Sequence, residues 1–233
     1  GALDWIGIAY GPPMQQISSC LRSFFVAPPG KMLIAGDFAG VESRGAAWFV
    51  NEAWKIRAFT DADAKKGLGV YELTASKTLG IPVESIGPDS VERQMGKVQE
   101  LAFQYQGGVA AARKFLPPSL KDTPEKVLNQ WKLGWRAEHP RIVKMWYELE
   151  RAAIAAVREP GSVHTVGSGD RRVVYTSTGN ALECHLPSGR IIYYQAPKLL
   201  EGVHGPRLTY MVAPTAGMTA IIDDPRNSDK WVR

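Results

Sequence analysis

The sequence predicts an α+β protein in which a mainly helical region precedes a small antiparallel sheet. Apolar residues recur at helical spacing in 40–54 and supply an apolar face in 140–157, and composition with start and stop signals predicts further helices between them. After Pro160 and Gly161, β-branched and aromatic residues gather in 163–175 and 181–194, interrupted by the turn sequences GSGD, STGN and PSGR. With 233 residues, 45% of them hydrophobic, the chain can bury a core as one large or two small domains.

Helix start and stop signals support the helical region. Gly80 suits a C-cap and is followed by Pro82, while Asp89 or Ser90 suits an N-cap. Thr123 followed by Pro124 is typical of another helix start. The expected helices cover about residues 40–54, 71–79, 90–105, 109–115, 123–135 and 140–157.

The N-terminal part is expected to place one carboxylate at the end of a strand. Residues 12–27 predict a short helix followed by an extended stretch, and the turn sequence PPG follows at 28–30. Residues 31–35 form a short apolar run that predicts a buried strand. Asp37 would then lie at the carboxyl end of that strand, just before the helix at 40–54.

Composition narrows the class of protein only moderately. A net charge of +5 is compatible with a polyanionic partner but does not establish one. Cys20 and Cys184 are isolated, which gives no zinc-binding spacing and favours reduced thiols in a cytoplasmic protein. No apolar run is long enough for a membrane helix and no signal-peptide layout is present. Because the sequence does not begin with Met, we expect a piece of a longer protein.

Asp37 is a candidate magnesium ligand. Mg²⁺ takes hard oxygen ligands and usually binds one or two carboxylates together with substrate phosphates. The main-chain carbonyl of Phe38 would be a second oxygen ligand. The alternative for Asp37 is an ordinary helix N-cap.

The helix expected at 90–105 carries a cationic stripe. Arg93, Lys97, Leu101 and Tyr105 follow one another at intervals of four residues, so they share one helix face. The guanidinium of Arg93 is a fork that suits phosphate oxygens, and Lys97 is a point charge one turn away. The alternative is a solvated basic face with Tyr105 in the core. Together with Asp37, the stripe suggests a site for phosphoryl transfer.

These residues also resemble two motifs of the A-family DNA polymerases of the phage type. The segment LIAGDFAGVESRGAAW is similar to the first palm motif of that family. The resemblance implies that Asp37 binds the metal and that Glu42 lies under the sugar and discriminates against a 2′-hydroxyl. Arg44 would be the arginine of the motif.

The second motif is the fingers helix, which RQMGKVQELAFQYQGG resembles. The resemblance implies that Arg93 and Lys97 bind the triphosphate and that Tyr105 faces the template and the sugar. Leu101 stands where the family has a bulky aromatic residue, and Tyr71 stands where a nucleotide-contacting histidine is common. LPSGRIIYY is similar to the hairpin that follows the fingers.

The resemblance implies a fold of mainly helical fingers inserted in an incomplete palm with a small antiparallel sheet. Residues 1–54 would be the N-terminal part of the palm, 55–160 the fingers, and 161–233 a β-rich hairpin segment returning toward the palm. The sequence has no His-Asp-Glu motif for a second metal-binding carboxylate, and Asp223 and Asp224 lie in a Pro-rich context that does not suit one. An internal piece of a longer polymerase is therefore expected.

The implied reaction adds a deoxynucleotide to a primer 3′-end, with Asp37 and Lys97 as catalytic residues and two Mg²⁺ ions at the site. The implied partners are primer–template DNA, dNTPs and the remainder of the polymerase chain, with no membrane. Without the second carboxylate we expect the 233 residues alone to be inactive. The alternatives are a non-catalytic nucleotide- or DNA-binding module, a single-subunit RNA polymerase, which Glu42 argues against, and a helical structural protein with a basic face.

Overall fold

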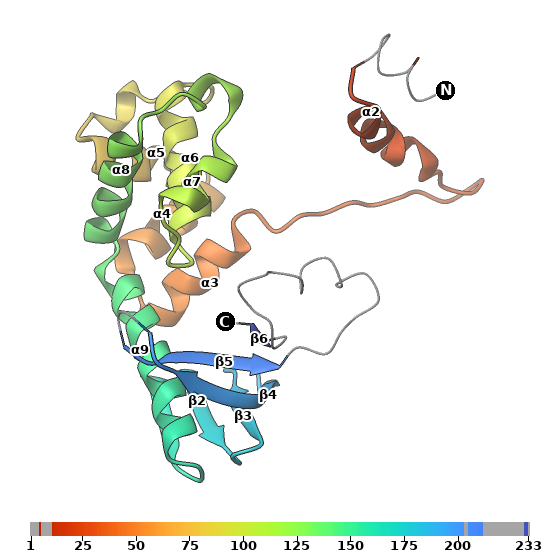
Figure 1. Cartoon of the computed structure of the whole chain (residues 1–233). Helices are drawn as coiled ribbons and strands as arrows, with labels where there is room; N and C mark the ends of the chain where they lie inside the picture. The colour runs from red at the N-terminus through yellow and green to blue at the C-terminus, as the bar shows by residue number, and fades with distance from the viewer. Residues whose placement is uncertain (1–4, 6–10, 203–204, 212–230, 233) are drawn as a thin grey trace. The chain divides into compact units, whose positions relative to one another are not determined.

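The computed structural model describes residue 5, residues 11–202, residues 205–211 and residues 231–232 (Figure 1). The chain divides into two compact units, unit 1 with residues 1–39 and unit 2 with residues 40–233. In the described part of the chain, no helix combines the length and the hydropathy needed to cross a membrane.

The described part of unit 1 includes a short helix and an exposed apolar stretch. Helix α2 (Pro13–Cys20) continues into the 3-10 helix η1 (Leu21–Phe24), which confirms the short helix predicted there. The buried strand predicted at 31–35 is wrong, because these residues are irregular and Met32 and Ile34 are 79% and 88% exposed. A strand needs a neighbouring strand to pair with, and the described part of unit 1 has none.

Unit 2 has the α+β composition that the sequence predicts. Its helical elements are α3 (Val41–Val50), α4 (Ala53–Asp63), α5 (Val70–Leu79), η2 (Val83–Ser85), α6 (Val91–Phe103), α7 (Val109–Phe115), η3 (Pro118–Leu120), α8 (Glu125–Glu138) and α9 (Pro140–Arg158). Its strands are β1 (Val163–Ser168), β2 (Arg171–Ser177), β3 (Ala181–His185), β4 (Ile191–Leu200), β5 (Arg207–Met211) and β6 (Trp231–Val232).

The helix ends follow local sequence signals, with one exception. Gly80 ends α5 in the left-handed conformation, with φ of 68°, and the Ser90 hydroxyl accepts a hydrogen bond from the Arg93 amide at 3.1 Å. Both predicted caps are thereby confirmed. Thr123 is not the N-cap of α8: its hydroxyl donates to the carbonyl of Leu120 at 2.6 Å and so closes the turn at η3.

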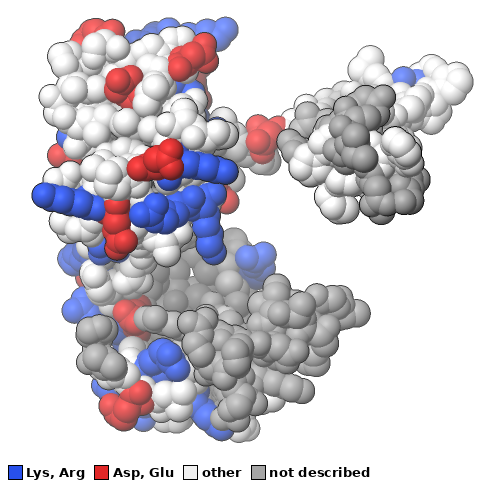
Figure 2. All heavy atoms as spheres, turned by 45° about the horizontal axis from the view of Figure 1, so that its top comes forward, with Lys and Arg blue, Asp and Glu red and all other residues white. Residues whose placement is uncertain are grey.

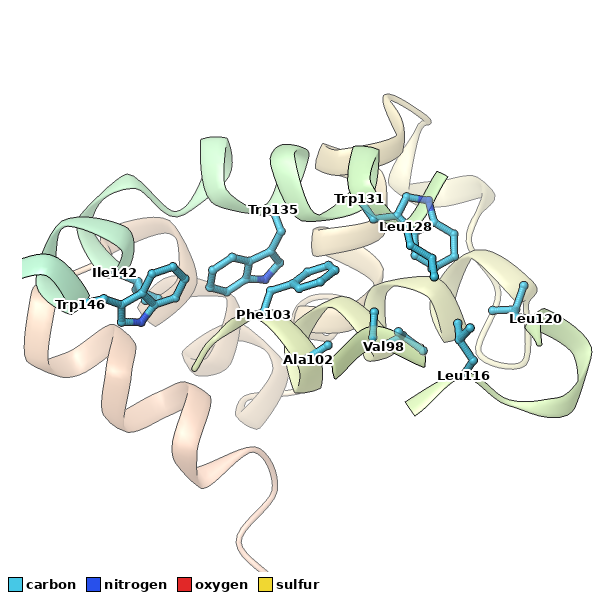
Figure 3. Close-up of a cluster of buried hydrophobic side chains, with 11 residues drawn as sticks. Val98, Ala102, Phe103, Leu116, Leu120, Leu128, Trp131, Trp135, Ile142 and Trp146 are labelled. Carbon is cyan, nitrogen blue, oxygen red and sulfur yellow. The ribbon is translucent and has the colours of Figure 1, made fainter. Parts of the chain in front are cut away.

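The first core lies among the helices (Figure 3). Trp135 of α8 is fully buried, and its ring stacks on that of Trp146 with a centroid separation of 5.8 Å. Packing was predicted for these rings and for Trp131, and burial confirms it, whereas Tyr147 is 44% exposed. The buried members are Val98, Ala102, Phe103, Ala112, Leu116, Leu120, Leu128, Trp131, Trp135, Ile142 and Trp146.

The second core lies between α9 and the sheet, along which α9 runs (Figure 1). The strands pair antiparallel in the order β1-β2-β3-β4-β5-β6. Ala153 and Ala156 of α9 pack with Val173 and Leu182 of the sheet. Strand β5 was not predicted, because its five residues follow a Gly- and Pro-rich stretch that hides the strand pattern. Asp223 and Asp224 lie outside the described residues.

Candidate functional site

Helix α6 presents the predicted cationic stripe on its solvent side. Lys97 is exposed, Arg93 and Leu101 are half-buried, and Tyr105 follows two residues after the helix ends and is 64% exposed. The opposite side of the helix is buried and includes Gly96. The stripe therefore faces away from the helical core.

Helix α5 holds the first cation of this stripe in place. The Nε atom of Arg93 donates to Oε1 of Glu72 at 2.5 Å, and the guanidinium carbon lies 5.4 Å from the centre of the Tyr71 ring. Burial raises the pKa of the Tyr71 phenol above its usual range. The ion pair uses the Nε–H donor of Arg93. The N–H donors on its two terminal nitrogens take no part in this pair.

A glycine allows α5 and α6 to approach this closely. A Cβ atom on Gly96 would lie 2.1 Å from the carbonyl oxygen of Tyr71 and 3.2 Å from Cβ of Ala75. Real Cβ atoms do not come so close to a backbone oxygen. The absence of a side chain at Gly96 therefore sets the distance between Arg93 and Tyr71.

The first turn of α3 meets the end of α6. Burial, and after it the charge and hydrogen-bonding capacity of the Glu42 carboxylate, raise the pKa of Tyr105. The charge of Glu42 is also a minor cause of the raised pKa of Tyr71, after burial and the charge of Glu100. Glu42 and Tyr105, 63 positions apart in the sequence, are in this way brought near each other.

Asp37 and Phe38 belong to unit 1, and both are exposed. A position of Asp37 opposite the stripe on α6 stays a prediction. In the part of the chain that the structure describes, no three His, Cys, Asp or Glu side chains gather as a metal site. Because Mg²⁺ usually takes one or two protein carboxylates together with substrate phosphates, a magnesium site at Asp37 stays a prediction.

Arg44 lies on the outer surface of unit 2. Its terminal nitrogens donate to both carboxylate oxygens of Asp63 at 2.7 and 2.8 Å, and its guanidinium carbon lies 4.4 Å from the centre of the Phe59 ring. The hydrogen bonds from Arg44 lower the pKa of Asp63. This arginine therefore ties α3 to α4.

A buried carboxylate that sequence reasoning missed lies directly behind the stripe. Oε2 of Glu100 accepts hydrogen bonds from Ser43 of α3 at 2.9 Å and from Lys55 of α4 at 2.6 Å. Its Oε1 accepts from Thr74 of α5 at 2.8 Å and from Trp135 of α8 at 3.0 Å. We call these five side chains the Glu100 cluster. Five helices meet at this one carboxylate.

The side chains around Glu100 favour an ion pair between Glu100 and Lys55. Burial by itself raises the pKa of Glu100, but Lys55 and His139 together outweigh it, the charge of Lys55 most, and hold that pKa well below its usual range. Burial also lowers the pKa of Lys55, against the opposing effect of Glu100. Nδ1 of His139 donates to the carbonyl of Trp135 at 2.7 Å, so Nε2 accepts from the Lys55 ammonium at 3.1 Å.

A sequence signal for this cluster exists but is weak. Glu100 lies four residues after Gly96 and three before Phe103, which puts it on the buried face of the helix. A charged residue on such a face indicates a buried partner. The partner, Lys55, is 45 residues away and sequence spacing does not identify it.

The Glu100 cluster predicts how stability depends on pH. Because the folded pKa of Glu100 is lowered, its contribution is complete above the ordinary value of 4.5 and is lost as the pH falls below it. We expect Glu100→Gln to be less stable than wild type near neutral pH, and the difference to narrow between about pH 6 and about pH 3. Urea unfolding across this range measures it, and parallel stability curves would contradict the assignment.

Two hollows of unit 2 are lined by residues other than those of the stripe on α6. One, of about 530 Å³, lies where α3, α9 and the β1–β2 turn meet, and it is lined by cations such as Arg141 and by acids such as Asp170. The other, of about 270 Å³, is lined by tyrosines of the sheet and by α9. Figure 2 shows basic and acidic side chains interspersed on the face in view.

Comparison with known proteins gives similar sequences but no matching family model. A DNA polymerase of Bacillus phage SP02 is 33% identical over 199 residues, which is 85% of this chain and 29% of that protein. DNA polymerase I of Aquifex aeolicus is 33% identical over 100 residues, which is 43% of this chain and 16% of that protein. DNA polymerase I of Rhizobium leguminosarum is 32% identical over 74 residues, 32% of this chain and 7% of that protein. The chain thus spans less than a third of the length of each of these relatives.

Proposed function

On the premise that the chain belongs to the A-family DNA polymerases, we propose that it supplies the nucleotide-binding face of such a polymerase. Its partners would be dNTPs, primer–template DNA and the remainder of the polymerase chain. The reaction would be transfer of a deoxynucleotide to the primer 3′-end.

The observation that carries this proposal is the ion pair of Arg93 with Glu72, which holds the guanidinium beside the Tyr71 ring where α5 and α6 meet. Glu42, from the other motif, lies near Tyr105 at the end of α6. Four residues with proposed nucleotide contacts therefore gather from three helices. A solvated basic face would not need an acid and two tyrosines at this position.

Each residue has a role that its chemistry suits. Arg93 would bind phosphate oxygens with its terminal nitrogens while Glu72 fixes its Nε, and Lys97 would add a second positive charge one turn along α6. Leu101 would contact the sugar and base with less surface than an aromatic ring. Glu42 would lie beneath the sugar, where it leaves no space for a 2′-hydroxyl.

The proposal includes Mg²⁺, for which this chain would supply only some of the ligands. Asp37 and the carbonyl of Phe38 would supply hard oxygen ligands. When bound, Mg²⁺ would neutralise phosphate charge and lower the pKa of the primer hydroxyl. The remaining carboxylate would come from a His-Asp-Glu motif, which the sequence of this chain lacks, so we expect no primer extension by the 233-residue chain alone.

Replacing Lys97 by alanine is expected to weaken binding of a Mg²⁺–dNTP to the chain by about tenfold to a hundredfold, because one charged contact to phosphate contributes about 1.5–3 kcal/mol. Isothermal titration calorimetry measures the affinity. Lys126→Ala is the matched control, because it removes the same charge from an exposed position on another helix, α8.

The proposal also separates nucleotide from DNA binding. Lys97→Ala should leave the affinity for primer–template DNA much less affected than the affinity for dNTP. Equal losses of both, or an equal effect of Lys126→Ala on dNTP affinity, would contradict a triphosphate role for Lys97. A chain that binds rNTP as tightly as dNTP would contradict the role of Glu42.

A further inference from the structure

The carboxylate of Glu100 has no freedom to turn. Both of its oxygens are occupied, Oε2 by Ser43 and Lys55 and Oε1 by Thr74 and Trp135. Lys55 is itself fully buried and Glu100 is 2% exposed. A charged group that is hydrogen bonded on all sides inside a core is a rigid point of attachment.

One attachment concerns the helix that carries Glu42. Ser43 follows Glu42 directly in the first turn of α3, and it is buried where Glu42 is exposed. The N-cap residue of α3, Gly40, makes no side-chain cap to hold this turn. The bond from Ser43 to Glu100 is a buried hydrogen bond that links the first turn of α3 to α6.

The same two helices also meet at the solvent side. Glu42 lies near Tyr105 there, while Ser43 donates a hydrogen bond to Glu100 inside. Two adjacent residues of α3 thus face two residues that lie five positions apart at the end of α6. The buried hydrogen bond holds the first turn of α3 against α6 and so limits the positions that the neighbouring Glu42 can take.

We propose that Glu100 and Ser43 are positioning residues, which hold the first turn of α3, and with it Glu42, in place relative to α6 from inside the core. Neither touches the proposed nucleotide face; they act through the orientation of the first turn of α3. This inference rests on the proposed function. It makes the Glu100 cluster a determinant of the choice between deoxynucleotides and ribonucleotides.

Two substitutions separate positioning from general stabilisation. Ser43→Ala and Thr74→Val each remove one buried hydroxyl that donates to Glu100, at 2.9 and 2.8 Å. Both leave the pair of Lys55 and Glu100 intact. Each is expected to lower the melting temperature by about 2–4 °C, as for the loss of one hydrogen bond in a domain of this size. Only Ser43 is adjacent to Glu42.

The readout is the titration of the Tyr105 phenol, measured by NMR on the chain with ¹³C-labelled tyrosine and without nucleotide. Tyr105→Phe assigns the resonance, and Glu42→Ala gives the titration of Tyr105 without its partner. We expect Ser43→Ala to lower the pKa of Tyr105 toward the value in Glu42→Ala, and Thr74→Val to leave it at the wild-type value. An unchanged pKa in Ser43→Ala, or equal shifts in both variants, would overturn the proposal.

Nucleotide affinity provides the functional readout. The ratio of dNTP to rNTP affinity should fall by about threefold to tenfold in Ser43→Ala and stay unchanged in Thr74→Val. If the wild-type chain binds no nucleotide, the proposed function fails, while the NMR titration still tests the positioning. A shifted Tyr105 pKa with an unaltered affinity ratio would overturn the specificity role.

Discussion

Replacing Lys55 by methionine is expected to lower the free energy of unfolding by about 3–5 kcal/mol near neutral pH, because breaking a buried ion pair leaves an uncompensated charge. Methionine has a similar length, so little packing is lost, but Glu100 keeps three neutral donors and loses its counter-charge. Urea unfolding followed by circular dichroism measures the change.

A double substitution isolates the charge. Lys55→Met combined with Glu100→Gln removes both charges and keeps an acceptor oxygen for Thr74 and Trp135. We expect it to be more stable than Lys55→Met alone, because the unpaired carboxylate is gone. A single variant as stable as wild type, or a double variant less stable than the single, would show that Glu100 is not ionised in the folded chain.

Replacing Gly96 by alanine is the second change with a large expected effect. In an ordinary helix interior, alanine in place of glycine stabilises by about 1 kcal/mol. At Gly96 we expect the opposite, a loss of about 1–3 kcal/mol, because the new methyl group would overlap the carbonyl oxygen of Tyr71. The two helices must separate, which also moves Tyr71 away from Arg93.

Gly45 provides the matched control. It lies inside α3, and a Cβ atom there would meet no atom within 4 Å. Gly45→Ala is therefore expected to stabilise the chain by about 1 kcal/mol. Thermal unfolding of Gly96→Ala and Gly45→Ala shows directly whether each substitution stabilises or destabilises the chain. If Gly96→Ala also stabilises, the close approach of α5 and α6 does not limit the packing.

Local signals in the sequence were sufficient for much of the helical region. The caps at Gly80 and Ser90 were predicted because each depends on bonds within a few residues. The four-residue spacing of Arg93 and Lys97 likewise predicted a shared helix face. The α+β class followed from the change of periodicity near residue 160, and the strands confirm it.

Pairing between distant segments could not be predicted in the same way. The apolar run at 31–35 has the composition of a strand, but a strand also depends on a partner that composition does not supply. The Glu100 cluster was missed for a related reason. Its members lie on five helices, and only folding brings Lys55 and Trp135 to the same carboxylate.

The sequence by itself determined the class of fold, the helix ends at Gly80 and Ser90, and the resemblance to the polymerase motifs, because backbone propensity and motif spacing are properties of short segments. The tertiary structure decided which side chains meet. Glu42 lies near Tyr105, and Glu100 is buried against Lys55, because burying the apolar faces of the helices sets their packing. That packing depends on all the helices at once, so no single segment encodes it.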